Sequence, residues 1–434
     1  MNSTCYLNKE YLYKDYDKKL DFEGVEGERL AHRLSKIAEI GLTKEGGANR
    51  PGYSEEEREA KNIVRKWMEG LGVTVQEDAA GNIIGKFLGK RSKLPSIMTG
   101  SHIDTVPNGG HFDGVLGVLT ALEVIESWKK QNYIPDRSIE LVIFSDEEGT
   151  RFNTGFTGSQ AMMGDLNIKE ISNLRDKTGL TFKEVIKKNN LSISKFNNAE
   201  RNKSEIAAFV ELHIEQGRQL EKFKQPVGIV SGISGQNIIE FSFFGIAEHA
   251  GNTPMDDRQD ALVAASEFVQ AVEKLPRQVS NSAVATIGQL RPYPNGVNVI
   301  PGRVDLSVDI RDIKKTNINE LTNLILNKAN NISHERNIVV KWEETLNVNP
   351  VSIEKEIQEI QALSLQKHQI KPFHIPSGAG HDAMSLGKYL PVSMFFVRCR
   401  DGISHNPREW TNLNDCIYGV HILKDFLERF PTRI

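Results

Sequence analysis

Apolar residues follow two different patterns along the chain, and each pattern predicts its own kind of structure. Up to about residue 216, short apolar runs alternate with helical stripes, which is the strand–helix–strand order of α/β proteins. The expected elements are strands at 82–87, 97–99 and 139–144 and helices at 54–71 and 114–130. Ser54 and Glu57 predict a capping box, and the helix at 114–130 is apolar nearly all round, so we expect it to be buried.

From about residue 226 the pattern changes to an alternation of apolar and polar residues, which is typical of antiparallel strands. The alternating stretch 227–251 is followed by a helix at 258–275, strands at 283–290 and 303–312, a helix at 317–332 and a strand at 338–346. This order predicts a small open-faced sandwich with two helices on one face. After 348 the α/β pattern returns, with helices at 353–368 and 415–429 around a strand at 392–397.

The two patterns together predict an α/β catalytic domain with a mixed sheet, interrupted by an inserted α+β domain. We place the catalytic domain at 1–216 and 348–434 and the inserted domain at 217–347. The Lys- and Asn-rich stretch 168–204 is interpreted as surface helices and loops, one of them capped by Thr181 and Glu184. A basic binding patch is the alternative interpretation of that stretch.

Composition excludes several classes of function. The net charge of −3 gives no basic field for nucleic acid or an anionic membrane, and no apolar run reaches the ~18 residues of a membrane helix. The polar N-terminus does not resemble a signal peptide. Cys5, Cys399 and Cys416 are too scattered for a disulfide framework or a cysteine zinc site, so we expect a cytoplasmic, reduced protein.

Candidate chemistry lies where apolar runs end. Asp146, Glu147 and Glu148 follow the strand at 139–144, and three adjacent carboxylates imply either a solvated turn or a counter-charge. Histidines and further acids follow other apolar runs or begin the buried helix; they are His102, Asp104, Asp113, His213 and His405. Taken singly, each residue has a structural explanation, since an Asp at position 113 is favourable at a helix N-terminus and a histidine is common in a polar turn. Their joint pattern favours a metal centre.

Five of these residues are sufficient for two metal ions if Asp113 bridges the pair. The candidate ligands are His102, Asp113, Glu148, His213 and His405. Each ion then has a histidine, a second nitrogen or oxygen ligand and the shared carboxylate, which leaves positions open. Glu147 stays free to act as a general base, and Asp104 is placed to hold the second ring nitrogen of His102. Such ligands suit zinc or manganese, with cobalt and nickel also possible.

Seven motifs between about residues 28 and 429 resemble one known family. They are "GSHIDTVPNGGHFDGVLGVL", "SDEEGTRF", "HIEQGRQLE", "GIAEHAGNTPMDDRQDAL", "GVNVIPGRVDLSVDIRD", "IPSGAGHDA" and "DGISHNPREWT". The sequence is similar to the di-metal amidohydrolases of the aminoacylase and carboxypeptidase superfamily, in the hydantoinase/carbamoylase branch. Arg151 and Gln216 match this branch better than the peptidases. The first eighteen or so residues resemble no part of it.

The resemblance implies a role for each matching residue. His102, Asp113 and His213 would hold one metal, Asp113, Glu148 and His405 the other, with Glu147 as the base and Asp104 orienting His102. The matching positions for substrate are Gln216, His249, Asn298, Arg311, His381 and Gly380. His249 would reach the active site of a partner subunit and stabilise the oxyanion. The inserted domain would be a lid and the contact of a homodimer.

The implied reaction is hydrolysis of a ureido or carbamoyl C–N bond in a small carboxylate, most simply an N-carbamoyl-L-amino acid giving amino acid, carbon dioxide and ammonia. Allantoate and N-carbamoyl-β-alanine, the β-ureidopropionase substrate, fit the same motifs. An aminoacylase or peptidase and a binding protein with an inactive site are the rival classes. Among the substrate residues, Arg311 could form only a surface ion pair, Asn298 only a turn, and His249 only a loop contact. "SGAG" lacks the Lys and Ser/Thr of a phosphate loop, which argues against nucleotide binding.

Overall fold

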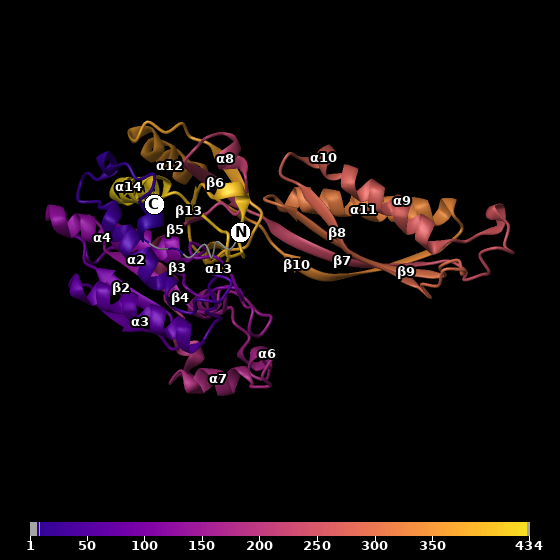
Figure 1. Cartoon of the computed structure of the whole chain (residues 1–434), viewed down its shortest axis with the longest axis horizontal. Coiled ribbons are helices and arrows are strands. Elements are labelled where there is room, and N and C mark those ends of the chain that lie inside the picture. Colours follow the sequence, from indigo (N-terminus) through magenta and orange to yellow (C-terminus); the bar gives the residue numbers. More distant parts are fainter. Residues whose placement is uncertain (1–6, 8, 432–434) are drawn as a thin grey trace. The chain divides into compact units, whose positions relative to one another are not determined.

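The structure, a computed structural model, describes residues 7 and 9–431, so Cys5 lies outside the described residues. The chain forms two compact units (Figure 1). The first unit comprises the described residues up to Val230, Ile353–Ile375 and the described residues from His381 onward. The second unit comprises Ser231–Ser352 and Pro376–Gly380.

These boundaries differ from the predicted insertion at 217–347. Strand β6 (Val227–Ile233) begins in the first unit, where it pairs antiparallel with β13 (Val392–Val397). An apolar strand suits either sheet, so the sequence pattern at 227–233 does not tell which sheet receives it. The short return of the second unit at Pro376–Gly380 has no signal in the sequence.

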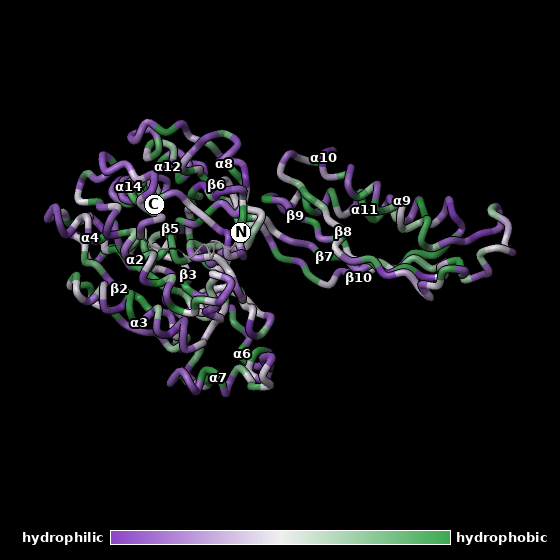
Figure 2. Tube along the Cα trace, in the orientation of Figure 1, coloured by the Kyte–Doolittle hydropathy of each residue, from purple (hydrophilic) through white to green (hydrophobic). Residues whose placement is uncertain are grey.

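The large sheet has nine strands in the order β1-β2-β4-β3-β5-β13-β6-β11, with β12 paired to β6. The remaining strands are β1 Thr74–Glu77, β2 Ile83–Phe87, β3 Ser96–His102, β4 Ile139–Phe144, β5 Ile206–Ile214, β11 Val351–Ser352 and β12 His374–Ser377. Strands β3, β4, β5 and β13 run parallel to one another. Every residue of β3, β4 and β13 is buried, as is usual for parallel strands covered on both faces. Figure 2 shows the hydropathy of each residue along the trace.

Helices of the first unit cover this sheet. Helix α4 (Val115–Gln131) packs on β3, β4 and β5, and α14 (Leu413–Arg429) packs on α4 and β13. The others are α1 Lys9–Leu12, α2 Gly27–Ala38, α3 Glu55–Gly70, α5 Thr157–Met163, α6 Ile168–Ile171, α7 Phe182–Lys188, α8 Gln219–Lys222, α12 Lys355–Lys367 and α13 Asp382–Leu386. Short 3₁₀ turns are η1 Lys18–Leu20, η2 Ile193–Ala199, η3 Lys203–Glu205 and η5 Arg400–Gly402. No helix among the described residues is long and apolar enough to cross a membrane.

The two predicted capping boxes differ in outcome. At α7, Thr181 and Glu184 make both hydrogen bonds of the box, which confirms that prediction. At α3, Ser54 Oγ accepts from the backbone N–H of Glu57 at 3.1 Å. The Glu57 carboxylate, however, accepts from the N–H of Tyr53 and pairs with Lys61 at 2.6 Å, so only half of that box forms.

The second unit is a four-stranded antiparallel sheet in the order β10-β7-β9-β8. Its elements are β7 Gly235–Phe244, β8 Val284–Tyr293, β9 Arg303–Asp312, β10 Val339–Val348, α9 Ala261–Lys274, α10 Pro276–Val279, α11 Lys315–Glu335 and η4 Met255–Asp257. Side chains of β9 alternate between the core and the open face, and Phe241, Phe268 and Ile325 lie in that core. The observed architecture confirms the predicted fold class.

Candidate metal centre

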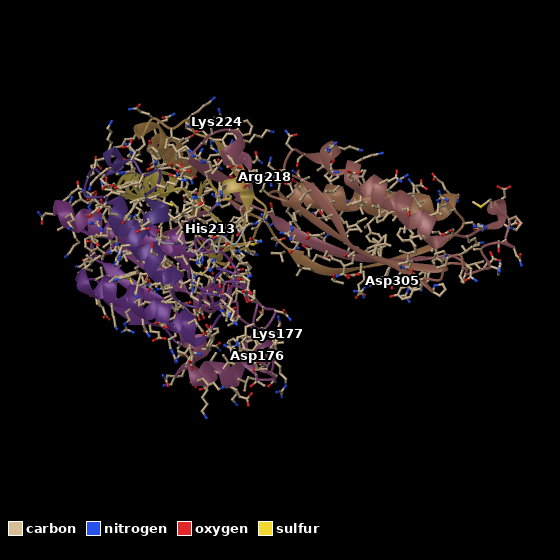
Figure 3. All side chains as sticks on the ribbon, in the orientation of Figure 1. Asp176, Lys177, His213, Arg218, Lys224 and Asp305 are labelled. Carbon is tan, nitrogen blue, oxygen red and sulfur yellow. The ribbon has the colours of Figure 1, made fainter. Side chains whose placement is uncertain are left out.

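The candidate ligands come together because four parallel strands end at one edge of the large sheet. His102 is the last residue of β3, and the acidic run 146–148 directly follows β4. His213 lies near the end of β5, and His405 lies in the loop after β13. Thr99 pairs with Val210, so the same register three residues further brings His102 beside His213, with ring centroids 5.9 Å apart. Carboxyl ends of parallel strands are the usual place for such sites. Figure 3 labels His213 among the side chains of the first unit.

Asp113 lies between two groups of ligand atoms. Its Oδ1 is 3.1 Å from His213 Nε2 and 3.5 Å from His102 Nε2. Its Oδ2 is 3.6 Å from His405 Nε2, which is also 3.6 Å from Glu148 Oε2. Ligands held 2.0–2.1 Å from a tetrahedral metal are separated by about 3.3 Å, so these spacings fit a metal in each group. The structure therefore brings all five predicted ligands together as two triads that share one carboxylate.

Glycine at position 114 allows Asp113 to approach the histidines. Gly114 has φ +62°, and a Cβ there would lie 2.5 Å from the ring of His102. Any other residue would push the ring away from Asp113. Among the non-glycine residues with left-handed backbone, three belong to the segments of this centre: Asp146, Gln216 and His405 have φ of 54°, 54° and 55°. Left-handed backbone costs roughly 1–2 kcal/mol per residue and often marks a functional site.

Asp104 contacts His102 and also holds the acidic turn. His102 Nδ1 lies 3.0 Å from the backbone carbonyl oxygen of Asp104 but 3.5 Å from its Oδ1. The Asp104 carboxylate instead accepts from the backbone N–H groups of Glu147 and Glu148, each at 3.1 Å. Asp104 thus contacts the histidine through its backbone and its carboxylate, and the same carboxylate holds the acidic turn. The spacing of two residues predicts the contact with His102 but not the bonds to the acidic turn.

The carboxylates of the centre are crowded and buried, so their negative charge is unfavourable without a nearby positive charge. Burial raises the pKa of Glu147 well above its ordinary value and, together with the nearby Asp113, raises the pKa of Glu148 to about 8. For His102, burial acts to lower the pKa, but the carboxylates of Glu147, Asp104 and Asp113 outweigh it and raise the pKa. Divalent cations would offset this charge, which favours a metal centre over a solvated turn.

Two of the predicted substrate residues lie against the triads. The Gln216 side-chain N–H donates to Asp113 Oδ2 at 2.8 Å, so its amide faces the bridging carboxylate. His381 is buried at the N-terminus of α13, with its ring centroid 4.5 Å from that of His213. Gly380 ends the short return segment of the second unit.

The other predicted substrate residues occupy opposite ends of the second unit. Arg311 lies near the end of β9, where it pairs with Asp309 at 2.9 Å and donates to the Gly378 carbonyl oxygen at 2.8 Å. His249 and Asn298 lie beyond the opposite end, where Ala250 N donates to the Asn298 carbonyl oxygen. From Arg303 to Arg311 the strand spans about 27 Å at ~3.4 Å per residue. One small molecule therefore cannot touch both groups of one chain.

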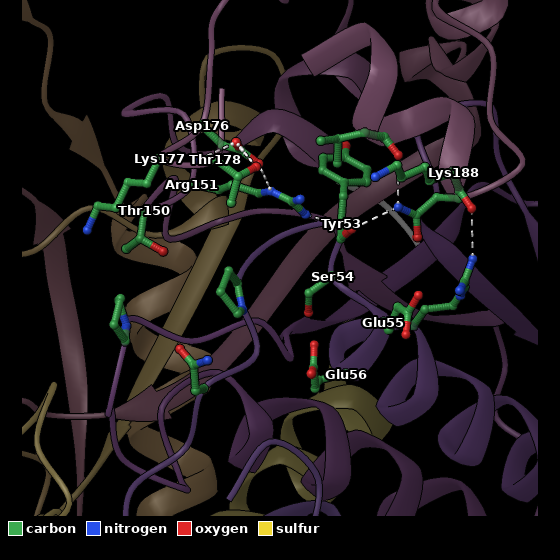
Figure 4. A pocket seen from close by; sticks show the side chains of 16 residues that line it. Tyr53, Ser54, Glu55, Glu56, Thr150, Arg151, Asp176, Lys177, Thr178 and Lys188 are labelled. Atoms are coloured by element: carbon green, nitrogen blue, oxygen red, sulfur yellow. Dashed lines mark hydrogen bonds and ion pairs between the residues drawn. The ribbon is translucent and has the colours of Figure 1, made fainter. Parts of the chain in front are cut away.

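Arg151 is one of the residues whose match favours the hydantoinase/carbamoylase branch over the peptidases. It lines a cavity of about 460 Å³ in the first unit (Figure 4). Its Nε pairs with Asp176 at 3.1 Å, and its Nη1 donates to the carbonyl oxygen of Tyr53 at 3.0 Å. These bonds attach the stretch 168–204 to the segment before α3. Lys177 and Lys188 share this cavity with Glu55 and Glu56, so the lining is of mixed charge.

Two buried residues near the ligands were not predicted. Arg50 is fully buried and donates from Nε to the carbonyl oxygen of Ile103, the residue before Asp104, at 3.0 Å. Glu409 is also buried, which raises its pKa to about 7, and it accepts hydrogen bonds from the turn of Asp113. In the sequence, Glu409 lies between Arg408 and Trp410 in a stretch without periodicity, so it resembles a surface residue.

Metal content is the direct test of the two triads. Protein dialysed against excess zinc or manganese should approach two ions per chain by elemental analysis. Asp113→Ala should weaken both sites because both triads use this carboxylate. His405→Ala should weaken one site only and provides the matched control. A firm value of one ion in the wild-type protein would contradict a bridging role for Asp113.

Comparison with known proteins gives consistent relatives over nearly the whole chain. The family model described as "Peptidase family M20/M25/M40" matches residues 98–429. An N-carbamoyl-L-amino acid amidohydrolase of Geobacillus stearothermophilus is 40% identical over 92% of this chain and 97% of that enzyme. An allantoate amidohydrolase of Bacillus subtilis is 33% identical over 90% of this chain and 94% of its own length. A solved amidase of the hydantoinase/carbamoylase family from Burkholderia multivorans is 32% identical, with a TM-score of 0.86 over 93% of this chain and 97% of its own.

Proposed function

This chain belongs to the peptidase family M20/M25/M40 and is a metal-dependent amidohydrolase, and we propose that its substrate is an N-carbamoyl-L-amino acid. Hydrolysis of the carbamoyl C–N bond would give the amino acid, carbon dioxide and ammonia. The observation that carries the proposal is Asp113, whose two oxygens each face a triad of ligands. Relatives at 40% and 39% identity that bear the name of this activity support the choice of substrate.

The residues of the centre divide the chemistry between them. His102, Asp113 and His213 would hold one divalent ion, and Asp113, Glu148 and His405 the other, with zinc, manganese, cobalt or nickel suited to such ligands. When bound, the ions supply polarisation of the substrate carbonyl and a lowered pKa of water. Glu147, whose burial raises its pKa, would accept the proton of the attacking water and return it to the leaving nitrogen.

Arg311 is suited to a substrate carboxylate because its own chain fixes its orientation. Its Nε and Nη2 donate to Asp309 at 3.1 and 2.9 Å, and its Nη1 donates to the Gly378 carbonyl oxygen. A guanidinium has five N–H donors, so these three bonds leave two, which point away from Asp309. The ion pair with Asp309, which was the alternative interpretation of Arg311, is therefore compatible with substrate binding. Asp309 orients the guanidinium, and two N–H donors remain for a ligand.

Arg311→Lys should raise KM by about 10- to 100-fold with a smaller change in kcat, because a two-donor contact with a carboxylate is lost. The measurement is steady-state kinetics with an N-carbamoyl-L-amino acid. Arg303→Lys is the matched control, since Arg303 lies on the same strand and pairs with Asp305 at 2.8 Å. Equal effects of the two substitutions on KM would contradict a substrate role for Arg311.

The hydrogen bonds of His249 leave its Nε2 as the donor, and the residue is exposed. Its Nδ1 accepts from the N–H groups of Gly251 and Asn252 at 3.1 and 3.2 Å, so the neutral ring carries its proton on Nε2. This N–H suits an oxyanion. Because β9 separates His249 and Asn298 from Arg311, the proposed homodimer supplies the partner subunit's His249 to each centre.

A panel of substrates tests the proposed function. Metal-loaded protein should release ammonia from N-carbamoyl-L-amino acids faster than from N-carbamoyl-β-alanine or allantoate. Preference for allantoate would instead identify the protein as an allantoate amidohydrolase. Two relatives, 33% and 34% identical, bear that name. Cleavage of N-acetyl-amino acids without turnover of any carbamoyl compound would overturn the proposal in favour of an aminoacylase.

A further inference from the structure

The loop that carries His405 needs a support that the sheet does not provide. His102 and His213 belong to strands β3 and β5, and both side chains are 1% exposed. His405 lies outside any helix or strand, has left-handed backbone, and its side chain is 48% exposed. Metal ligands need to be held to within about 0.5 Å of the productive geometry by the surrounding structure. The second triad therefore depends on whatever fixes this loop against Asp113.

Glu409 provides that connection. Its Oε1 accepts from the backbone N–H of Phe112 at 2.8 Å and from that of Asp113 at 3.1 Å. The side chain is 3% exposed, so water does not compete for these bonds. Glu409 is four residues from His405 but nearly three hundred residues from Asp113 in the chain. A single carboxylate thus joins the loop of one ligand to the backbone of another.

Ser404 strengthens the same connection. Its Oγ donates to Asp113 Oδ2 at 2.6 Å and lies 3.1 Å from Glu409 Oε2. The chain also keeps space for Glu409: a Cβ on Gly110 would lie 2.0 Å from the Glu409 carboxyl carbon. Gly110 has a negative φ, so backbone conformation does not require glycine there. Glycine is needed at position 110 because a side chain there would collide with the Glu409 carboxylate.

We propose that Glu409 is a positioning residue, which holds the Asp113 turn and the His405 loop at the separation that the second metal ion requires. The proposal rests on the metal centre of the proposed function. It assigns no contact with substrate to Glu409. Loss of a group that orients metal ligands typically weakens metal affinity by about 10- to 100-fold.

Zinc binding separates this role from general stability. In equilibrium dialysis with elemental analysis, the wild-type protein should bind two ions. Glu409→Ala should keep the first ion and bind the second about 10- to 100-fold more weakly. Glu409→Gln should restore the second site, because its amide oxygen can accept both backbone bonds and its NH₂ can donate to Ser404. Gly110→Ala, which displaces the carboxylate without removing it, should behave as Glu409→Ala does.

Asp260→Ala is the matched control. Asp260 also accepts two backbone N–H bonds at 2.8 and 3.1 Å, from Leu262 and Val263, but it lies in the second unit. It should lose stability and keep both ions. The proposal is overturned if Glu409→Ala binds the second ion as the wild type does, or if Glu409→Gln is as weak as Glu409→Ala.

Two further outcomes are distinguishable. A wild-type protein that binds fewer than two ions would contradict the metal centre itself rather than the role of Glu409. If Glu409→Ala does not fold, Gly110→Ala decides: a second site of wild-type affinity there overturns the proposal, and a weakened one supports it. Adding Gly110→Ala to Glu409→Ala should change zinc binding no further, since the carboxylate it displaces is already gone.

Discussion

Glu147→Gln should lower kcat by about 10²- to 10⁴-fold and leave two metal ions bound, because only the proton acceptor is lost. Glutamine has the shape of glutamate, and the Asp104 carboxylate holds the backbone N–H of residue 147, so the turn should keep its geometry. The candidate ligands do not include Glu147, although its Oε2 lies 3.7 Å from His102 Nε2. Steady-state kinetics and elemental analysis of the same preparation provide the measurement.

Glu148→Gln is the control for that experiment. Its carboxylate belongs to the triad of Asp113 and His405, so its loss should lower occupancy of the second site. Activity should then recover in part when more metal is supplied, whereas the activity of Glu147→Gln should not. If the two variants showed the same metal content and the same response to added metal, the roles of the adjacent glutamates would be assigned wrongly.

Two inactive variants, His249→Ala and Glu147→Gln, should regain activity when they are mixed. If each centre uses its own Glu147 and the partner subunit's His249, a mixed dimer has one site with both defects and one site with neither. Random exchange makes half of the dimers mixed, so about a quarter of wild-type activity should return if the sites act independently. The span of β9 between Arg311 and His249 is the reason to expect this sharing.

A mixture of Glu147→Gln with Asp113→Ala is the matched control for complementation. Both defects lie in the first unit, so every site in a mixed dimer lacks one of its own groups and activity should stay low. Subunit exchange is measured independently with two differently tagged chains. Mixed dimers that form without recovery would mean that His249 serves its own chain or has no part in catalysis.

The ligands could be predicted from the sequence because local pattern and sheet geometry agree. A histidine or an acid that ends a buried parallel strand, or lies in the turn after it, is placed at the same edge of the sheet as its counterparts. His102, Glu148 and His213 all follow this rule. The strand of His102 is longer than its apolar run, since β3 continues through Gly100 and Ser101. Ser101 is tolerated in the core because its hydroxyl donates to the buried Glu211.

Features that depend on distant partners could not be predicted. The role of Glu409 is defined by backbone groups of Phe112 and Asp113, and no periodicity reports such a contact. The spacing of Asp104 from His102 predicts a contact between these two residues, but not the bonds that the Asp104 carboxylate accepts from a turn more than forty residues away. The sequence places Gln216 among the substrate residues but does not predict its left-handed backbone or the bond that its amide donates to the bridging carboxylate. Neither strain nor long-range hydrogen bonding is visible in a single sequence.

The boundaries of the second unit restrict how this enzyme can be recombined. The chain passes between the units at 230/231, 352/353, 375/376 and 380/381, so the second unit consists of two separate pieces of sequence. A chimera that exchanges only 231–352 keeps the host's 376–380, and with it the Gly378 carbonyl that Arg311 contacts. Grafted specificity would then depend on where the host segment places that backbone carbonyl. Divergence by substitutions within one scaffold is therefore more accessible to such a protein than the transfer of a whole module.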